Sequence, residues 1–354
     1  MYKTCKAIII QKPLHAEVKE IKLPEVTDES IVIRTFYSAI SSGTEVKTWN
    51  GKTGKLGGEL WYPLVPGYEQ VGIVEYVGPK AKMKTALGED IKVGDRVMSN
   101  EIRNYPDYCA AWGGQVEISV KNSSTAPSPF DMPAIIPEKL SFQDAVVCYL
   151  AAVAQKGINK VGIKEGETVI VTGMGAVGLS ALQLAKLAGA KTIAIDKGQW
   201  KSDRVKSIAD HVICHNASYE TLIPMVADIT KGRMADVVIE ATGDSKVINN
   251  LRKLTRDGGW EIDDDGARVH LQGDYPEPVC LTPYQEWFNR NLRLSMSCAL
   301  RAGDKESILK LASEGKFNTD ILWDKEVPLE QAPFEYADIE NNRDNRMKTL
   351  IKWN

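Results

Sequence analysis

Residues 168–178 read TVIVTGMGAVG, and this stretch decides the fold of the second half of the chain. The β-branched run Val169–Val171 predicts a buried strand, and the apolar spacing over the next turns predicts an amphipathic helix. Between them lie three glycines in G-x-G-x-x-G spacing: Gly173, Gly175 and Gly178. The first glycine permits a tight turn, the second lets a pyrophosphate approach the backbone, and the third lets helix and strand pack closely. The stretch therefore predicts a dinucleotide-binding turn.

The start of the predicted helix is the expected pyrophosphate site, because free amides such as those of Ala176 and Val177 favour an anion there. A second strand, 191–195, is followed by Asp196, about 20 residues beyond the glycines. A carboxylate there binds the ribose hydroxyls and repels a 2′-phosphate, which favours NAD over NADP. Lys197 and Lys201 could instead meet a phosphate, so NADP stays open as the alternative.

Length, charge and cysteine usage describe a cytoplasmic enzyme. At 354 residues the chain is long enough for two domains. The 44 basic and 47 acidic residues give a net charge of −3 without a basic block, which argues against nucleic acid as a partner. The sequence has neither a long apolar run nor a signal-peptide pattern, so we expect no membrane association. The six cysteines are scattered, which predicts free thiols.

The order of predicted elements divides the chain. Residues 1–135 carry short β-branched runs separated by Gly, Pro and Asp, which predict a β-rich region. Ser141 is a candidate N-cap for a helical run over 142–157. Strands are then predicted at 168–172, 191–195, 211–214, 235–240, 267–272 and 292–298, with helices near 176–188, 201–209, 217–231 and 245–255. This alternation predicts an α/β fold with a parallel, doubly wound sheet. The tail carries helical patterns at 304–314 and 329–340 and a last strand near 347–353.

Several short motifs, in this order and spacing, make the chain resemble the medium-chain dehydrogenase/reductase superfamily over nearly its whole length. They are Ser42-Gly-Thr-Glu-Val-Lys47, Pro66-Gly-Tyr-Glu69, Val93-Gly-Asp-Arg-Val97, Gly113-Gly-Gln-Val-Glu117, the glycine turn and Glu240-Ala-Thr-Gly243. The resemblance implies a GroES-like β-rich catalytic domain over residues 1–153 and 301–354. A Rossmann dinucleotide-binding domain would span 154–300. It also implies that Thr242 contacts the cofactor, and Lys201 falls where NAD-dependent relatives carry a basic residue.

The sequence departs from the family at the catalytic zinc. Zinc-dependent members carry a Cys and a His as ligands, and these positions are Ser42 and Tyr68 here. Catalytic zinc needs about three protein ligands, so the loss of two predicts that zinc is absent. Cys148 falls close to the third ligand position, but a small buried core cysteine is the preferred interpretation. The cysteine-rich structural zinc lobe of many relatives is missing as well.

Without zinc, a side chain must exchange the proton of the substrate hydroxyl. The resemblance offers Thr44, at a family proton-relay position, Lys47, at a family histidine, and Tyr68, at a zinc ligand. An adjacent ammonium would lower the pKa of the phenol and make Tyr68 and Lys47 an acid/base pair. Equally, Tyr68 could only fill the space of the lost metal, and Lys47 could be a solvated surface residue. Glu69 matches a family carboxylate beside the metal, where a structural hydrogen-bond acceptor is the preferred role.

The segments around Ser42 and Tyr68 most resemble the bacteriochlorophyllide dehydrogenase-like branch of zinc-lacking relatives. Aromatic residues could wall a ring-shaped substrate, or could equally belong to the core or an interface: Trp49, Trp61, Tyr62, Tyr105, Tyr108 and Trp112. The main hypothesis is a zinc-independent, NAD-dependent dehydrogenase that interconverts a secondary alcohol and a ketone on a polar or ring-bearing small molecule. The alternatives are a reductase of activated C=C bonds and a nucleotide-binding protein without catalytic activity. We also expect a homodimer or larger homo-oligomer that pairs the strand near 292–298 across a two-fold axis.

Overall fold

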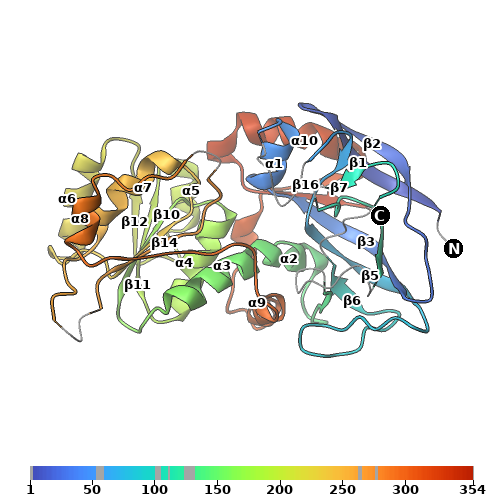
Figure 1. Ribbon diagram of the computed structural model, residues 1–354, viewed down its shortest axis with the longest axis horizontal. Coiled ribbons are helices and arrows are strands. Elements are labelled where there is room, and N and C mark those ends of the chain that lie inside the picture. The colour runs from blue at the N-terminus through green and yellow to red at the C-terminus, as the bar shows by residue number, and fades with distance from the viewer. Residues whose placement is uncertain are drawn as a thin grey trace. The chain divides into compact units, whose positions relative to one another are not determined.

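The protein is described by a computed structural model that covers residues 3–52, 60–99, 105–110, 112–122, 132–261, 265–275 and 278–353. It divides into two compact units, drawn as ribbons in Figure 1. The first unit comprises Met1–Tyr149 and Arg301–Asn354, and the second comprises Leu150–Leu300. The predicted boundary after residue 153 falls in helix α3 (Cys148–Val161), the helix in which the chain passes from the first unit to the second.

The second unit is built on a parallel sheet. Within the described residues its strands follow the order β12-β11-β10-β13-β14-β15, and each neighbouring pair is parallel. The strands are β10 (Thr168–Thr172), β11 (Lys191–Asp196), β12 (His211–Cys214), β13 (Val237–Glu240), β14 (Arg268–Leu271) and β15 (Arg293–Met296). This order reverses direction between β10 and β13, which is the arrangement of dinucleotide-binding sheets. The predicted doubly wound fold is confirmed.

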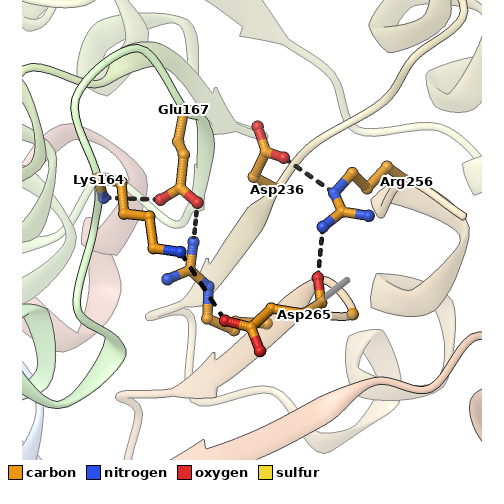
Figure 2. Close-up of a pocket in the computed structure, with 7 residues that line it drawn as sticks. Lys164, Glu167, Asp236, Arg256 and Asp265 are labelled. Atoms are coloured by element: carbon orange, nitrogen blue, oxygen red, sulfur yellow. Dashed lines mark hydrogen bonds and ion pairs between the residues drawn. The ribbon is translucent and has the colours of Figure 1, made fainter. Parts of the chain in front are cut away.

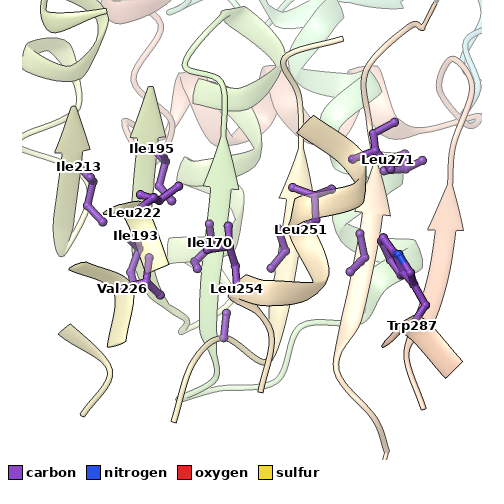
Figure 3. Packing of buried hydrophobic residues seen from close by; sticks show 14 residues of the cluster. Ile170, Ile193, Ile195, Ile213, Leu222, Val226, Leu251, Leu254, Leu271 and Trp287 are labelled. Carbon is purple, nitrogen blue, oxygen red and sulfur yellow. The ribbon is translucent and has the colours of Figure 1, made fainter. Parts of the chain in front are cut away.

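Helices alternate with these strands: α4 (Ala176–Leu187), α5 (Gln199–Arg204), α6 (Tyr219–Ile229), α7 (Ser245–Leu251) and α8 (Tyr284–Phe288). Strand β13 is buried along its whole length, as expected when helices cover both faces of a parallel sheet. Figure 3 shows the buried layer in which Ile170 and Ile193 of the sheet lie with Leu251 of α7.

The first unit is β-rich, as predicted. Within the described residues one sheet has the order β2-β1-β4-β7, and a larger one has the order β16-β17-β3-β5-β6-β9, with β8 also paired to β3. The strands are β1 (Thr4–Lys12), β2 (His15–Lys22), β3 (Ser30–Ile40), β4 (Leu64–Val65), β5 (Glu69–Val77), β6 (Arg96–Met98), β7 (Cys109–Ala110), β8 (Ile118–Asn122), β9 (Ala134–Ile135), β16 (Lys325–Pro328) and β17 (Thr349–Lys352). The C-terminal strand β17 is antiparallel to β3, so the tail completes the first unit.

The helices of the first unit are α1 (Thr44–Trp49), α2 (Phe142–Val146), α9 (Asp304–Ser313) and α10 (Ala332–Asn341). The sequence does not indicate α1, whose threonines are weak helix formers; burial of Val46 and Trp49 against α10 outweighs that propensity. Ser141 caps α2 as predicted, because its Oγ accepts the amide of Asp144 at 3.0 Å. The run predicted over 142–157 is divided into α2 and α3 at Val147.

Candidate active site

The predicted cofactor residues end or follow strands that finish at the same edge of the parallel sheet. Thr172, the last residue of β10, pairs with Ile195 of β11 and with Glu240 of β13. The chain leaves this edge through Gly173 after β10, while Asp196 ends β11. Ligands of open parallel sheets bind at the carboxyl ends of the strands, where the strand order reverses. The fold therefore brings the candidate cofactor residues together.

Each glycine of the turn lacks a side chain for a different structural reason. Gly173 has a φ of 88°, and a Cβ there would lie 2.9 Å from Cγ2 of Thr242. A Cβ on Gly178 would lie 1.8 Å from the carbonyl oxygen of Gly173, so helix α4 could not pack on the turn. A Cβ on Gly175 would instead meet no described atom within 4 Å. Gly175 is the N-cap of α4 and has no side chain to accept a first-turn amide such as that of Val177, which fits an anion at this helix end.

The carboxylate of Asp196 is held in a fixed orientation by two backbone amides. The amide of Met174 donates to Oδ2 at 2.6 Å, and the amide of Gly198 donates to Oδ1 at 2.8 Å. Each oxygen keeps a further lone pair for another donor, as a ribose hydroxyl would be. Lys201 lies on α5, which begins immediately after Gly198.

Thr242 is tied to a buried carboxylate that sequence reasoning did not single out. Its amide donates to Oε1 of Glu240 at 2.7 Å, and its hydroxyl donates to the same oxygen. The hydroxyl of Tyr275 donates to the other oxygen. Burial raises the pKa of Glu240. Thr242 is therefore fixed beside Gly173, where the resemblance implies a cofactor contact.

In the first unit, strand pairing brings two of the predicted catalytic residues, Thr44 and Tyr68, together. Ala39 of β3 pairs with Glu69 of β5, so the segment after β3 adjoins the residue before β5. The segment after β3 carries Ser41 and then Thr44, the first residue of α1, and the residue before β5 is Tyr68. The hydroxyl of Tyr68 donates to Oγ of Ser41 at 2.7 Å, and the side chain of Thr44 also bonds to it. Three hydroxyl groups thus meet at Tyr68, where the resemblance implies a zinc ligand.

The phenol of Tyr68 is only 5% exposed and is surrounded by aromatic rings. The ring of Trp112 meets it edge-on with centroids 5.4 Å apart, and the ring of Tyr149 lies tilted at 5.2 Å. Trp112 has a φ of 69°, an uncommon conformation for a bulky residue.

Burial raises the pKa of the Tyr68 phenol, and the nearby carboxylates of Glu69 and Glu45 raise it further. This corrects the expectation that the ammonium of Lys47 lowers that pKa. Lys47 is half-buried on α1, one turn beyond Thr44. The charged groups that act on the phenol pKa are carboxylates, which raise it, so the phenol stays protonated.

Glu69 is buried in an ion pair that sequence reasoning missed. The ammonium of Lys348 contacts both of its carboxylate oxygens, and both side chains have zero exposure. The two residues are distant in sequence, but β3 lies between β5 and β17, and Ala39 pairs with Glu69 on one side and Leu350 on the other. Glu69 is therefore a buried hydrogen-bond acceptor, and its donor is the ammonium of Lys348.

The donors at the family's zinc position do not fit a catalytic zinc ion. The hydroxyl of Tyr68 is engaged with other hydroxyls, and Ser42 replaces the cysteine ligand. The thiol of Cys148 donates to the carbonyl of Asp144 at 3.2 Å, and burial raises its pKa, which disfavours the metal-binding thiolate. Across the described part of the chain, no three His, Cys, Asp or Glu side chains are grouped to hold a metal.

The other predicted aromatic residues are divided between core and surface. Trp49 stacks on Tyr336 in the core with centroids 6.4 Å apart, and the hydroxyl of Tyr105 donates to a backbone carbonyl at 2.7 Å. Trp61 is 50% exposed. Much of the glycine-rich segment before Trp61, residues 53–59, lies outside the described residues.

A cavity of about 180 Å³ lies at the opposite edge of the parallel sheet (Figure 2). Its walls carry both signs of charge: Lys164, Arg256 and Arg268 with Glu167, Asp236 and Asp265. These charges are mutually paired, for example Arg256 with Asp236 at 3.0 Å and Arg268 with Glu167. Because the cavity lies at the amino ends of the strands, it is not the cofactor site.

Two further observations concern the helices and the cysteines. Among the described residues, no helix combines the length and apolar character that crossing a membrane requires. All six cysteines are free, as predicted.

Comparison with known proteins yields two family matches. The family described as alcohol dehydrogenase GroES-like domain matches residues 27–126, and the family described as zinc-binding dehydrogenase matches residues 176–260. An uncharacterized zinc-type alcohol dehydrogenase-like protein of Haemophilus influenzae is 26% identical over 98% of both chains. An alcohol dehydrogenase of Geobacillus stearothermophilus is 28% identical over 89% of this chain and 91% of its own. A solved structure from E. coli CFT073, described as a short chain alcohol dehydrogenase complexed with NADH, has a TM-score of 0.81 at 21% identity. The match covers 99% of this chain and all of that one, which shows a shared fold.

Proposed function

Given that the chain belongs to the medium-chain dehydrogenase/reductase superfamily, we propose that it is a zinc-independent, NAD-dependent dehydrogenase. It interconverts a secondary alcohol and a ketone on a polar or ring-bearing small molecule. The observation that carries this proposal is the hydroxyl of Tyr68, which stands at the metal position and bonds to Ser41 and Thr44.

The cofactor assignment is supported by the edge of the parallel sheet. The open space at Gly175 and the start of α4 would receive the pyrophosphate, and the oriented carboxylate of Asp196 would hold the ribose hydroxyls. A 2′-phosphate would be repelled by Asp196, which favours NAD over NADP. The relatives named as alcohol dehydrogenases and the NADH complex of a structural neighbour support a nicotinamide cofactor. When bound, the nicotinamide supplies the hydride acceptor or donor.

The substrate proton is exchanged with the hydroxyl groups of Tyr68 and Thr44. Zinc would polarise the substrate oxygen and lower the pKa of the alcohol. In its place, the neutral phenol of Tyr68 acts as a general acid towards a ketone, and Thr44 relays the proton at the half-buried side of the site. Lys47, one turn along α1, is the remaining candidate for proton exchange.

The proposal extends to a homodimeric assembly and a cytoplasmic location. β15 is the last strand of the parallel sheet in the described residues, and its final residue, Met296, is an exposed apolar side chain. Pairing of β15 with its copy across a two-fold axis would cover this edge and give a homodimer. A monomer in sedimentation at micromolar concentration would contradict that assembly. Six free cysteines support a reducing, cytoplasmic location.

A hydride-transfer assay tests the proposed reaction. The purified chain is mixed with NADH and a panel of ketones and enones, and with NAD and the matching secondary alcohols, and absorbance of NADH is followed. Turnover of ketones and alcohols, with enones inert, is expected. Turnover of enones alone would identify a C=C reductase, and tight NADH binding without any turnover would identify a nucleotide-binding protein.

A further inference from the structure

Ser41 supplies a second buried hydroxyl directly against the phenol of Tyr68. Its Oγ accepts the Tyr68 hydrogen at 2.7 Å, and its side chain is 2% exposed. To protonate a ketone, the phenol hydrogen must turn from Ser41 to the ketone oxygen, and the Ser41 hydroxyl, which can donate as well as accept, can then donate to the phenol oxygen. The direction in which Tyr68 offers its oxygen is thus set by the position of Ser41.

The main chain of Ser41 is itself held by a buried carboxylate. The amide of Ser41 donates to Oε2 of Glu45 at 2.9 Å. The other oxygen of Glu45 accepts Nε2 of Gln115 at 3.0 Å and the hydroxyl of Tyr336 at 3.2 Å. Glu45 has zero exposure. One carboxylate therefore joins the segment after β3 to helix α10 and to the chain near β8.

This network continues to the C-terminal end of the chain. Oε1 of Gln115 accepts the hydroxyl of Ser38 at 2.5 Å, and Oγ of Ser38 accepts the indole N–H of Trp353 at 2.8 Å. Gln115 is also confined by Gly67, because a Cβ at Gly67 would lie 2.4 Å from Cγ of Gln115. Glu45, Gln115 and Ser38 each make at least two of these hydrogen bonds, so Ser41 has little freedom to move.

We propose that Ser41 is a positioning residue for the proton-handling phenol of Tyr68, and that Glu45 holds Ser41 in place through its backbone amide. The inference rests on the proposed function, because it assigns Ser41 to the same proton exchange. Ser41 holds the phenol oxygen in a fixed position, first as the acceptor of its hydrogen and then as a donor to the phenolate that is left when this hydrogen passes to the ketone oxygen. Such pre-orientation contributes to rate because misplacement of a catalytic group by about 1 Å can cost about 10²-fold.

The test compares Ser41→Ala with Ser99→Ala. Ser99 is a matched control, because it is equally buried in the same unit and its hydroxyl lies 3.3 Å from the hydroxyl of Ser119. With the best alcohol of the panel, Ser41→Ala is expected to lower kcat about 10- to 100-fold. KM and the dissociation constant of NAD are expected to stay within about twofold, and Ser99→Ala to leave all three unchanged. A kcat for Ser41→Ala within twofold of wild type would overturn the inference.

A double variant separates positioning from a general loss of structure. In the Tyr68→Phe background the hydroxyl that Ser41 orients is gone, so adding Ser41→Ala is expected to have no further effect on kcat. An equal loss in both backgrounds would show that Ser41 acts independently of Tyr68 and would overturn the inference. Ser41→Thr, which keeps a hydroxyl, is expected to recover most of the rate.

A spectroscopic readout keeps the inference separate from the proposed reaction. With tyrosines labelled at the ring carbon that bears the hydroxyl, the Tyr68 signal is identified by its loss in Tyr68→Phe. Ser41→Ala is expected to shift this signal, and Ser99→Ala to leave it in place. If no substrate is turned over, the proposed function fails but this shift still reports whether Ser41 holds the phenol. An unchanged signal in Ser41→Ala would overturn the inference, whatever the activity.

Discussion

Replacing Lys348 by Met removes the ammonium from a fully buried ion pair while keeping a side chain of similar length. Because Lys348 and Glu69 both have zero exposure, water cannot solvate the carboxylate that remains. Removing one partner of a buried pair typically costs about 3–5 kcal/mol, and the bidentate contact argues for the upper part of that range here. The free energy of unfolding of the first unit should therefore fall by about 4 kcal/mol at pH 7.

The assay is urea unfolding followed by tryptophan fluorescence, because most tryptophans lie in the first unit: Trp49, Trp61, Trp112, Trp323 and Trp353. Lys325→Met is the matched control, since the Lys325 ammonium lies 2.6 Å from Glu335 but is 43% exposed. Its loss should cost at most about 1 kcal/mol. In the double variant Lys348→Met with Glu69→Gln no buried charge is left alone, so most of the stability should return. A loss below about 1 kcal/mol for Lys348→Met, or a double variant no more stable than the single one, would refute the reasoning.

Three further predictions address the cofactor, the buried acid and the phenol. Asp196→Ala should weaken NAD binding by about 1–3 kcal/mol in calorimetric titration and spare NADP, because the ribose hydroxyls lose their charged acceptor; a wild-type preference for NADP would show that Asp196 has another role. Burial raises the pKa of Glu45 from 4.5 to about 7, so the folded chain keeps a proton that the unfolded chain releases above pH 4.5. The free energy of unfolding should then decline between pH 4.5 and pH 7 by at most about 3 kcal/mol, and a urea series in which Glu45→Gln keeps the same decline would argue against this origin. Tyr68→Phe should lower turnover by about 10²–10⁴ with NAD binding unchanged, whereas near-normal turnover would transfer the proton role to Thr44 and Lys47.

The sequence predicted the second unit more fully than the first for a physical reason. Around Gly173, local signals suffice: a β-branched strand, a glycine turn and an amphipathic helix are each encoded within a few residues. Strands such as β10 (Thr168–Thr172) and β12 (His211–Cys214) have the predicted bounds. In the first unit α1 was missed, because its helical state comes from packing of Val46 and Trp49 rather than from propensity.

Of the predicted catalytic residues, Tyr68 and Thr44 lie together, but the electrostatics around the phenol could not be derived from the sequence. The motifs placed Tyr68 and Thr44 in one site, and the structure joins their side chains. Lys348 reaches Glu69 only because β3 lies between β5 and β17, a pairing that no local pattern encodes. Ser41 adjoins the motif at Ser42 and could have been found as the next hydroxyl-bearing residue. The direction of the Tyr68 pKa was predicted wrongly because the depth of burial and the surrounding carboxylates depend on the fold.

The central claim, hydride transfer without zinc, is tested most directly by measuring bound zinc and turnover on the same sample. The chain is purified without metal affinity media, assayed with NAD and the best alcohol of the panel, and analysed for zinc before and after treatment with a strong chelator. We predict far less than one zinc per chain and the same kcat before and after chelation, because Ser42 and Tyr68 stand where two metal ligands would be. About one zinc per chain, with turnover lost on chelation and restored by added zinc, would contradict the account.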